Sequence, residues 1–342
     1  MRTRSWFGFI LSSLLVLTGG TTCLAANPPP ADAQAMIEAL TKANAAVVGL
    51  QVTAAEGARS AETLGRQRSG SGVVIGPDGL ILTIGYLVME AQTIEVITQD
   101  RRMVPARPVA YDLATGFGLI RPLVPLRGLA PVPLGSHGDL RTGDMVMASI
   151  GGSDADVAMT QLVSKRPFSG YWEYHIETAL FTSPPIGNHS GAGLFNQRGE
   201  LLGIGSLFVG DATGENRRTP GNMFVPVDLL KPILAELQQT GSSRQSHRPW
   251  LGLTSAEQDG RVQVVRVTKD SPAQSAGLRS GDVVLAVDGA KVATLEEFYR
   301  KLWSRGSPED EIRLTVLQGA EVKTFTLRGV DRMTTMMKPA GI

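Results

Sequence analysis

Short apolar runs separated by turn residues form the dominant pattern along this chain. Residues 70–83 contain two runs rich in Val, Ile and Leu, joined by Pro77-Asp78-Gly79, a sequence that favours a β-hairpin turn. Strand-like runs recur at 46–52, 93–98, 103–109, 118–121, 144–150 and 160–165. Strands spaced by about 8–12 residues with turn signals between them are typical of barrels and sandwiches. The pattern therefore predicts a mostly β fold for the larger part of the chain.

Helical spacing interrupts this pattern near residue 40 and again after residue 226. Residues 33–46 are rich in Ala, and the apolar positions of 227–239 recur with helical spacing. A Gly-, Ser-, Gln- and Arg-rich linker follows at 241–248. Beyond it we expect a strand, a helical turn that begins at a proline, a second strand, a helix and a hairpin, at 262–267, 271–278, 281–287, 294–303 and 312–327. This order predicts a smaller α+β domain over 249–330 and a flexible tail over 331–342.

Composition narrows the classes of protein that this chain can belong to. Its 342 residues are 42% hydrophobic and 19% charged, which is ordinary for a globular protein of about two domains. The net charge is +1, so charge gives no reason to expect nucleic-acid binding. The four histidines show no His-x-x-x-His spacing, and we expect neither a metal site nor a cofactor.

The N-terminus has the pattern of a secretory signal. Arg2 and Arg4 precede the apolar stretch 6–17, and Cys23-Leu24-Ala25 offers small residues for cleavage. The stretch is shorter than the roughly 20 residues of a membrane span. We therefore expect a signal peptide at 1–25 and an exported, periplasmic protein, with an uncleaved membrane anchor as the alternative. Cleavage would remove Cys23, the only cysteine, and would exclude thiol catalysis and disulfides.

One serine lies in a loop suited to acyl-transfer chemistry. Residues 188–194 read Asn-His-Ser-Gly-Ala-Gly-Leu. Small residues around Ser190 can bring a hydroxyl and several backbone N–H groups together, as a nucleophile and its oxyanion hole require. Glycine and serine are also common in turns without any catalytic role, so Ser190 could equally be present because a small residue fits a tight turn.

Several segments, in this order, resemble the HtrA/Deg family of exported serine proteases. The likeness covers about residues 36–328 and is carried by 70–75, 79–83, 224–230, 271–273, 276–278 and 281–283. The resemblance implies a trypsin-like (chymotrypsin-like) double β-barrel over 33–240, followed by a PDZ domain over 249–330. It also raises the question of trimers, because the family uses aromatic residues before its first barrel. Residues 31–72 contain no Phe, Tyr or Trp, so trimerisation is doubtful.

The resemblance also implies where a catalytic triad should lie, and two of its positions differ here. Tyr86 stands at the position of the family's general-base His, and Gly116 at that of the Asp that orients it. Ser190 keeps the nucleophile position, whereas Asn188 replaces a glycine of the oxyanion loop formed by Asn188, His189 and Ser190. The intervals between the three positions fit the family, so the register is credible and the chain reads as a degenerate, pseudoprotease-like member.

These replacements remove the usual activation of the serine. A serine hydroxyl needs a base whose pKa lies near the working pH, and a tyrosine with a pKa of about 10 is protonated at neutral pH. Gly116 has no side chain with which to orient a base. His175, on the strand before the serine loop, is an alternative base. We expect Tyr86 to fill the former cleft, and Asp112 to cap a turn.

The PDZ part carries the clearer prediction of binding. The resemblance places Trp250, Leu251, Gly252 and Leu253 in the loop that binds a C-terminal carboxylate, with Leu251 and Leu253 beside an apolar pocket. The alternative is a structural strand with no ligand. We therefore predict an inactive adaptor or chaperone-like scaffold that binds C-terminal or unfolded peptide segments, or a regulator that joins an active HtrA-type protease. The alternative function is a serine endopeptidase of periplasmic protein quality control that uses Ser190 with a non-standard base.

Overall fold

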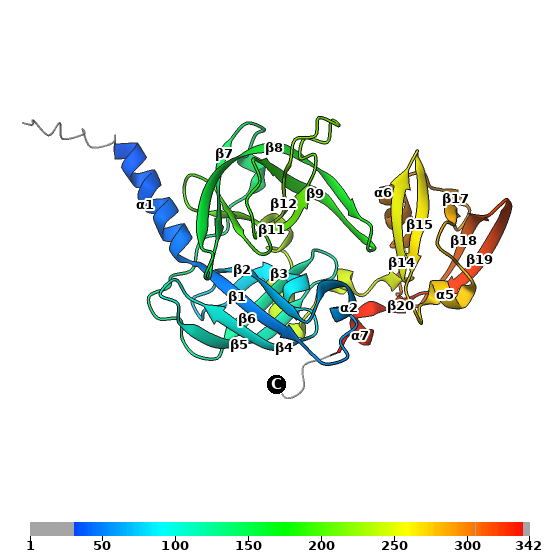
Figure 1. Cartoon of the computed structure of the whole chain (residues 1–342), viewed down its shortest axis with the longest axis horizontal. Coiled ribbons are helices and arrows are strands. Elements are labelled where there is room, and N and C mark those ends of the chain that lie inside the picture. Colours follow the sequence, from blue (N-terminus) through cyan, green and yellow to red (C-terminus); the bar gives the residue numbers. More distant parts are fainter. Residues whose placement is uncertain (1–30, 305, 338–342) are drawn as a thin grey trace, which may run out of the picture.

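The computed structural model describes residues 31–304 and 306–337, and the predicted signal peptide lies outside them. A helix, α1 (Ala31–Ala45), leads into two closed β-barrels and then into a smaller α+β domain. Figure 1 shows the barrels stacked against each other and the smaller domain beside them. The predicted fold class, a double β-barrel followed by an α+β PDZ domain, is confirmed at this level.

The first barrel closes in the order β1-β2-β3-β6-β5-β4. Its members are β1 (Val47–Ala54), β2 (Gln67–Val74), β3 (Ile81–Ile84), β4 (Ala91–Ile97), β5 (Met103–Tyr111) and β6 (Phe117–Pro122). The hairpin predicted around Pro77-Asp78-Gly79 joins β2 to β3, with Val73 opposite Leu82. Two single-turn helices, α2 (Ala61–Leu64) and α3 (Gly85–Val88), lie in the connections. Because α3 follows β3 directly, it begins at a fixed point on the barrel rim.

The second barrel closes in the order β10-β11-β12-β9-β8-β7. Its members are β7 (Met145–Ile150), β8 (Asp156–Gly170), β9 (Tyr174–Ser183), β10 (Gly193–Phe195), β11 (Leu201–Val209) and β12 (Gly221–Pro226). The β8–β9 hairpin is long, and in Figure 1 its tip reaches the smaller domain. The serine loop joins β9 to β10 at the seam between the two barrels. One buried cluster contains side chains of both barrels, and the second barrel has a further cluster of its own.

The smaller domain has its own core. Its sheet runs β14-β15-β16-β18-β19, so β14 is an edge strand, and β17 pairs with β16. The elements are β14 (Leu253–Gln258), β15 (Arg261–Val267), α5 (Pro272–Ala276), β16 (Val283–Val287), β17 (Ala290–Lys291), α6 (Leu295–Leu302), β18 (Glu311–Gln318) and β19 (Glu321–Arg328). Thr294 caps α6 by accepting the N–H of Glu297, and Phe298 and Tyr299 of α6 are completely buried.

Three local predictions need correction. The helix expected over 227–239 is divided into a short 3-10 turn, η2 (Val227–Leu229), and α4 (Leu234–Thr240), because Pro232 has no N–H and restricts the residue before it. The segment expected as a linker contains a second 3-10 turn, η3 (Arg244–Ser246), and is held by Asp112, which accepts hydrogen bonds from Ser243 and Ser246.

The segment predicted as a flexible tail is ordered over residues 331–337. Strand β20 (Val330–Asp331) pairs with β13 (Pro249–Trp250), and α7 (Arg332–Thr335) follows. The backbone N–H of Met337 then donates to the Glu90 carboxylate at 3.0 Å. Met337 thus contacts the first barrel through Glu90, and no pattern in the sequence predicts this contact.

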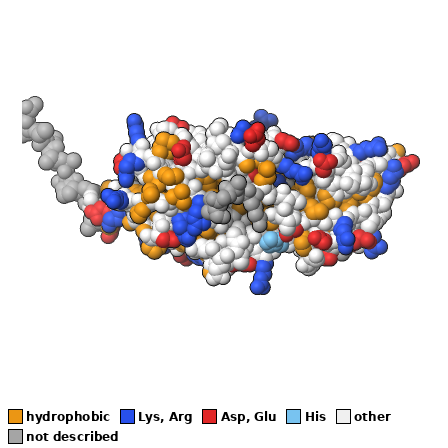
Figure 2. Space-filling view, turned by 90° about the horizontal axis from the view of Figure 1, so that it is seen from below, with side chains coloured by type: hydrophobic (Ala, Val, Ile, Leu, Met, Phe, Trp, Pro, Cys, Tyr) orange, Lys and Arg blue, Asp and Glu red, His pale blue; other side chains and the backbone are white. Residues whose placement is uncertain are grey.

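The surface carries mixed charge. Acidic and basic side chains are interspersed over the face seen in Figure 2, without one sign dominating it. Within residues 31–304 and 306–337, none of the helices combines the length and apolar character that crossing a membrane would require.

Candidate functional site

The serine loop is fixed by contacts across the barrel seam. The carbonyl oxygen of Ser190 accepts the N–H of Ser71 at 2.8 Å, and Gly191 donates its N–H to Gly205 at 2.8 Å. A Cβ at Gly191 would lie 1.9 Å from the carbonyl oxygen of Ser71, and its φ is +78°. Both observations require glycine here. The loop therefore holds the Ser190 side chain half-exposed at the boundary between the barrels.

Tyr86 and Ser190 meet in the structure, as the sequence register requires. The Tyr86 hydroxyl lies 2.7 Å from Ser190 Oγ and 2.8 Å from the carbonyl oxygen of Ser206 on β11. A carbonyl oxygen only accepts hydrogen bonds. The Tyr86 hydroxyl therefore donates its single proton to the carbonyl oxygen of Ser206. The Ser190 hydroxyl can then donate its own proton to the Tyr86 oxygen.

The electrostatics of this pair do not favour proton abstraction. Burial raises the pKa of Tyr86 to about 12, and the hydrogen bond to Ser190 only partly opposes this effect. The phenol is therefore neutral throughout the physiological range, and a neutral phenol is a very weak base. The geometry of a nucleophile and its partner is present, but the partner lacks the basicity that activates a serine.

Gly116 lies behind Tyr86 in a turn that leaves little room for a side chain. Its carbonyl oxygen accepts the N–H of Gly85, the first residue of α3, at 2.7 Å. Its φ is +82°, and a Cβ there would lie 3.3 Å from the Tyr174 hydroxyl. That hydroxyl donates to the carbonyl oxygen of Thr115 at 2.6 Å. Tyr174 thus covers the space above Gly116.

Asp112 has no free acceptor oxygen for catalysis. One oxygen accepts from Ser243 and Ser246, and the other accepts from the N–H and hydroxyl of Thr115. Burial would raise the pKa of Asp112, but the hydrogen bonds from Ser243, Ser246 and Thr115 hold it below its usual range. The carboxylate fastens a turn and the inter-domain segment, which fits the expected capping role.

Arg68 supports the short helix that carries Tyr86, and sequence reasoning missed it. Its buried guanidinium donates to the carbonyl oxygens of Tyr86 and Met89 at 2.9 and 2.7 Å, and to the Ser60 hydroxyl at 2.8 Å. Burial lowers its pKa, while the charge of Glu90 acts in the opposite direction. A lone arginine beside a loop carries no sequence signal that would reveal this role.

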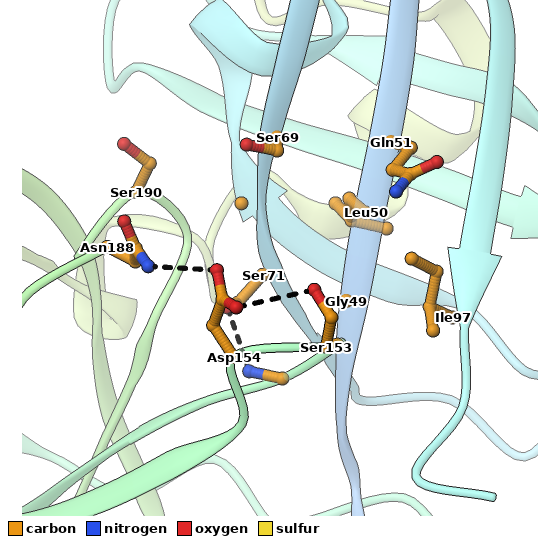
Figure 3. Close-up of a pocket in the computed structure, with 13 residues that line it drawn as sticks. Gly49, Leu50, Gln51, Ser69, Ser71, Ile97, Ser153, Asp154, Asn188 and Ser190 are labelled. Carbon is orange, nitrogen blue, oxygen red and sulfur yellow. Dashed lines mark hydrogen bonds between the residues drawn. The ribbon is translucent and has the colours of Figure 1, made fainter. Parts of the chain in front are cut away.

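Two hollows flank Ser190. One, of about 90 Å³, is lined by Asn188, Asp154 and Ser190 on one side and by Leu50, Gln51 and Ile97 on the other (Figure 3). The Asn188 amide donates to Asp154 at 3.2 Å, and the φ of Asn188 is +46°. The second hollow, of about 260 Å³, lies between Tyr86, Arg68 and Leu64. Ser190 thus borders a hollow on each side, and Tyr86 lines one of them without filling it.

The two histidines nearest the serine loop in the sequence, His175 and His189, have different surroundings. His189 precedes Ser190 and is partly buried, which lowers its pKa. His175 Nδ1 lies 2.9 Å from the Ser169 hydroxyl, and Nε2 lies 3.4 Å from a Glu177 oxygen, so its ring nitrogens face the β8–β9 hairpin.

His175, Glu177 and Glu296 form a group whose ligand atoms all lie within 4.8 Å of one another, a spacing that could hold a metal ion. The Arg300 guanidinium already bridges the two carboxylates. This arginine supplies the positive charge that a cation would otherwise bring.

The loop that was expected to bind the C-terminal carboxylate of a peptide binds the side chain of Glu173 instead. Trp250 belongs to β13, and Leu251 and Leu253 are 0% and 2% exposed in the domain core, so they do not line an open pocket. The N–H groups of Leu251, Gly252 and Leu253 all donate to the side chain of Glu173, at 3.1, 2.7 and 2.7 Å. A carboxylate therefore does lie in this loop, and the second barrel supplies it.

The two structural units match two known domain families. The trypsin-like peptidase domain family matches residues 70–204, which carry Tyr86, Gly116 and Ser190. The PDZ domain family matches residues 249–328. The chain is HtrA-like, with a trypsin-like domain followed by a PDZ domain.

The curated relatives of this HtrA-like chain are longer than the part that the chain matches. It is 31% identical over 281 residues to a probable periplasmic serine endoprotease DegP-like of Halomonas elongata, covering 77% of this chain and 56% of that protein. It is 27% identical over 286 residues to the putative serine protease HhoA of Synechocystis, covering 76% of this chain and 70% of that protein. The chain spans about half the length of several of the curated relatives that it matches.

Solved structures share the fold. The HtrA-type protease AlgW with decapeptide aligns over 89% of this chain and 99% of its own, with a TM-score of 0.54 and 21% identity. The serine endoprotease from Yersinia pestis aligns over 89% of this chain and 98% of its own, with a TM-score of 0.53 and 22% identity. At this level of identity the likeness concerns the fold alone.

Proposed function

We propose that this chain is an exported HtrA-like protein of periplasmic protein quality control that binds peptide segments. The periplasmic location is supported by the names of its relatives and by the predicted signal peptide at 1–25. Peptide binding is supported by the PDZ family match and by the AlgW structures with bound peptides. We place the domain limits at 33–240 and 249–330, joined by the segment 241–248.

We propose further that Ser190 is not an activated nucleophile and that the chain acts by binding, as an adaptor or chaperone-like scaffold. The observation that carries this proposal is the buried phenol at Ser190 Oγ, with a pKa of about 12. Loss of the catalytic base alone lowers kcat by about 10⁶ in a serine protease. Gly116 has no side chain and supplies no carboxylate. Tyr174 also covers the space in which such a carboxylate would lie.

A fluorophosphonate probe tests this proposal directly, because it labels only a serine hydroxyl that is activated. The wild-type chain is compared with Ser190→Ala, and an active trypsin-like protease serves as the positive control. We expect no labelling above the Ser190→Ala background at pH 7–8 and no turnover of denatured casein. Labelling that disappears in Ser190→Ala would refute the non-catalytic proposal.

The second candidate is a serine endopeptidase that uses Ser190 with a non-standard base. The names of the relatives, which are serine endoproteases, support this alternative better than an inactive adaptor. Ser190 also borders both hollows, so its hydroxyl is not enclosed by the protein. On this view, labelling at neutral pH would be lost in Ser190→Ala, and its pH dependence would identify the base. A midpoint near 12 would indicate the Tyr86 phenolate, and a midpoint near 6 would indicate a histidine.

A further inference from the structure

The tip of the β8–β9 hairpin lies in the groove of the PDZ domain. Glu173 is 4% exposed, and its φ of +58° turns the chain sharply at the tip. One carboxylate oxygen accepts from Gly252 and Leu253, and the other accepts from Leu251. Three consecutive backbone N–H groups thus converge on one carboxylate, which is the arrangement that an anion-binding loop provides.

The tip, a turn over residues 171–173, makes a backbone hydrogen bond with the edge strand β14 and contacts α6 on its other side. The carbonyl oxygen of Tyr171 accepts the N–H of Ser255, at 2.9 Å, from the edge strand β14. On the opposite side, the Tyr299 hydroxyl of α6 donates to the carbonyl oxygen of Gly170 at 2.8 Å and accepts the N–H of Glu173 at 3.3 Å. The tip is therefore held between β14 and α6, with its carboxylate at the loop before β14.

The surrounding contacts hold the tip in place from the barrel side. Tyr174, the next residue, packs against Gly116 and donates to Thr115. Arg248 donates to the backbone carbonyl oxygen of Glu173 at 3.3 Å. Burial raises the pKa of Glu173, whereas the three N–H groups and the charge of Arg332 act against that rise. The carboxylate has thus exchanged water for protein donors, as a bound ligand carboxylate does.

We propose that residues 170–173 are a built-in ligand of the PDZ groove, with Glu173 in the place of a C-terminal carboxylate. A partner chain that ends in a free carboxylate then binds only by displacing the tip. This second part rests on the peptide binding proposed above, whereas the first part does not. Such a groove is closed to weak ligands, because a ligand binds only the fraction of molecules in which the tip has left.

Amide exchange in the full chain tests the first part. In Glu173→Ala we expect the N–H groups of Leu251, Gly252 and Leu253 to exchange at least tenfold faster than in the wild type. Glu177→Ala is the matched control. Glu177 lies on the same hairpin and pairs with Arg300 of α6, but makes no contact with the loop amides, so their exchange should not change. Unchanged exchange in Glu173→Ala would overturn the proposal.

Acetate gives a second readout that does not depend on any peptide. In Glu173→Ala, millimolar acetate should enter the vacated loop and restore the protection of the same three amides, whereas acetate should have no effect on the wild type. Failure of acetate to restore protection would overturn the role of the loop as a carboxylate site. If Glu173→Ala does not fold, Glu173→Gln keeps the volume and removes the charge. We expect severalfold faster exchange in that variant, and unchanged exchange would again overturn the proposal.

Peptide binding tests the second part. The probe is a pool of random decapeptides with free C-termini, compared with the same pool amidated at the C-terminus. We expect Glu173→Ala to bind the free-carboxylate pool at least tenfold more tightly than the wild type and to ignore the amidated pool. Equal affinity in both proteins would overturn displacement. Binding by neither protein, together with faster exchange in Glu173→Ala, would refute the proposed peptide binding and leave the built-in ligand standing.

Discussion

Replacement of Gly116 by aspartate is the most direct test of whether this barrel still has space for a triad carboxylate. The wild-type position combines a φ of +82° with a contact distance of 3.3 Å between an ideal Cβ and the Tyr174 hydroxyl. An aspartate there must adopt the left-handed region, and it must push back the tyrosine hydroxyl, which strains the hydrogen bond to Thr115. We therefore expect Gly116→Asp to lower the free energy of unfolding.

Two effects set the size of this loss. The left-handed conformation costs a non-glycine residue about 1–2 kcal/mol. Loss of the buried hydrogen bond between Tyr174 and Thr115 adds about 1–3 kcal/mol, because the Thr115 carbonyl oxygen loses its donor. Together they predict a destabilisation of about 2–5 kcal/mol, the larger part of which comes from crowding by Tyr174.

Gly128 provides a matched control for the backbone effect. Its φ is +80°, and nothing lies within 4 Å of an ideal Cβ there. Gly128→Asp should therefore cost only about 1–2 kcal/mol. Urea unfolding of both variants, followed by far-ultraviolet circular dichroism, measures the difference. If Gly116→Asp is no less stable than Gly128→Asp, Tyr174 does not obstruct the position and the reasoning is wrong.

Two further predictions concern the surroundings of Tyr86. Because burial raises the pKa of Tyr86 to about 12, the unfolded chain loses this proton near pH 10 while the folded chain keeps it. The wild type should lose about 2 kcal/mol more stability between pH 10 and 12 than Tyr86→Phe does, measured by urea unfolding at matched pH, and an equal loss in both would contradict the shift. Arg68→Met should cost about 3–5 kcal/mol, since it leaves the carbonyl oxygens of Tyr86 and Met89 without their donor. The exposed Arg66→Met should change stability by less than about 0.5 kcal/mol in the same assay, and a similar loss in both variants would argue against a special role for Arg68.

The sequence allowed much of the fold to be predicted because its strands are local patterns. The hairpin around Pro77-Asp78-Gly79 needs only a turn signal and two flanking runs, and it forms as expected. The prediction of one helix over 227–239 is wrong, because Pro232 interrupts the periodic apolar pattern and prevents a continuous helix. The tail beyond Val330 could not be predicted, because its pairing with β13 depends on a contact between distant segments.

The candidate site divides in the same way. The contact between Tyr86 and Ser190 could be predicted, because the interval between them matches that between the base and the nucleophile of the HtrA/Deg family. Their side-chain oxygens lie 2.7 Å apart. Arg68 and Glu173 could not be predicted, because each is a single polar residue, at the start of β2 and in the β8–β9 turn, with no repeat around it. Glu173 reaches amides 78–80 positions away along the chain, a contact that only the relative placement of the two domains creates.

The glycine after the serine has a consequence for how such motifs are interpreted. Gly191 lies so close to Ser71 of the other barrel that any larger residue would force the barrels apart. The two halves of the molecule could not close without a minimal residue there, whether or not a bond is ever cut. A Ser-Gly pair in this fold is therefore evidence of how the barrels are joined, and a test for hydrolytic activity must look to the group that faces the hydroxyl.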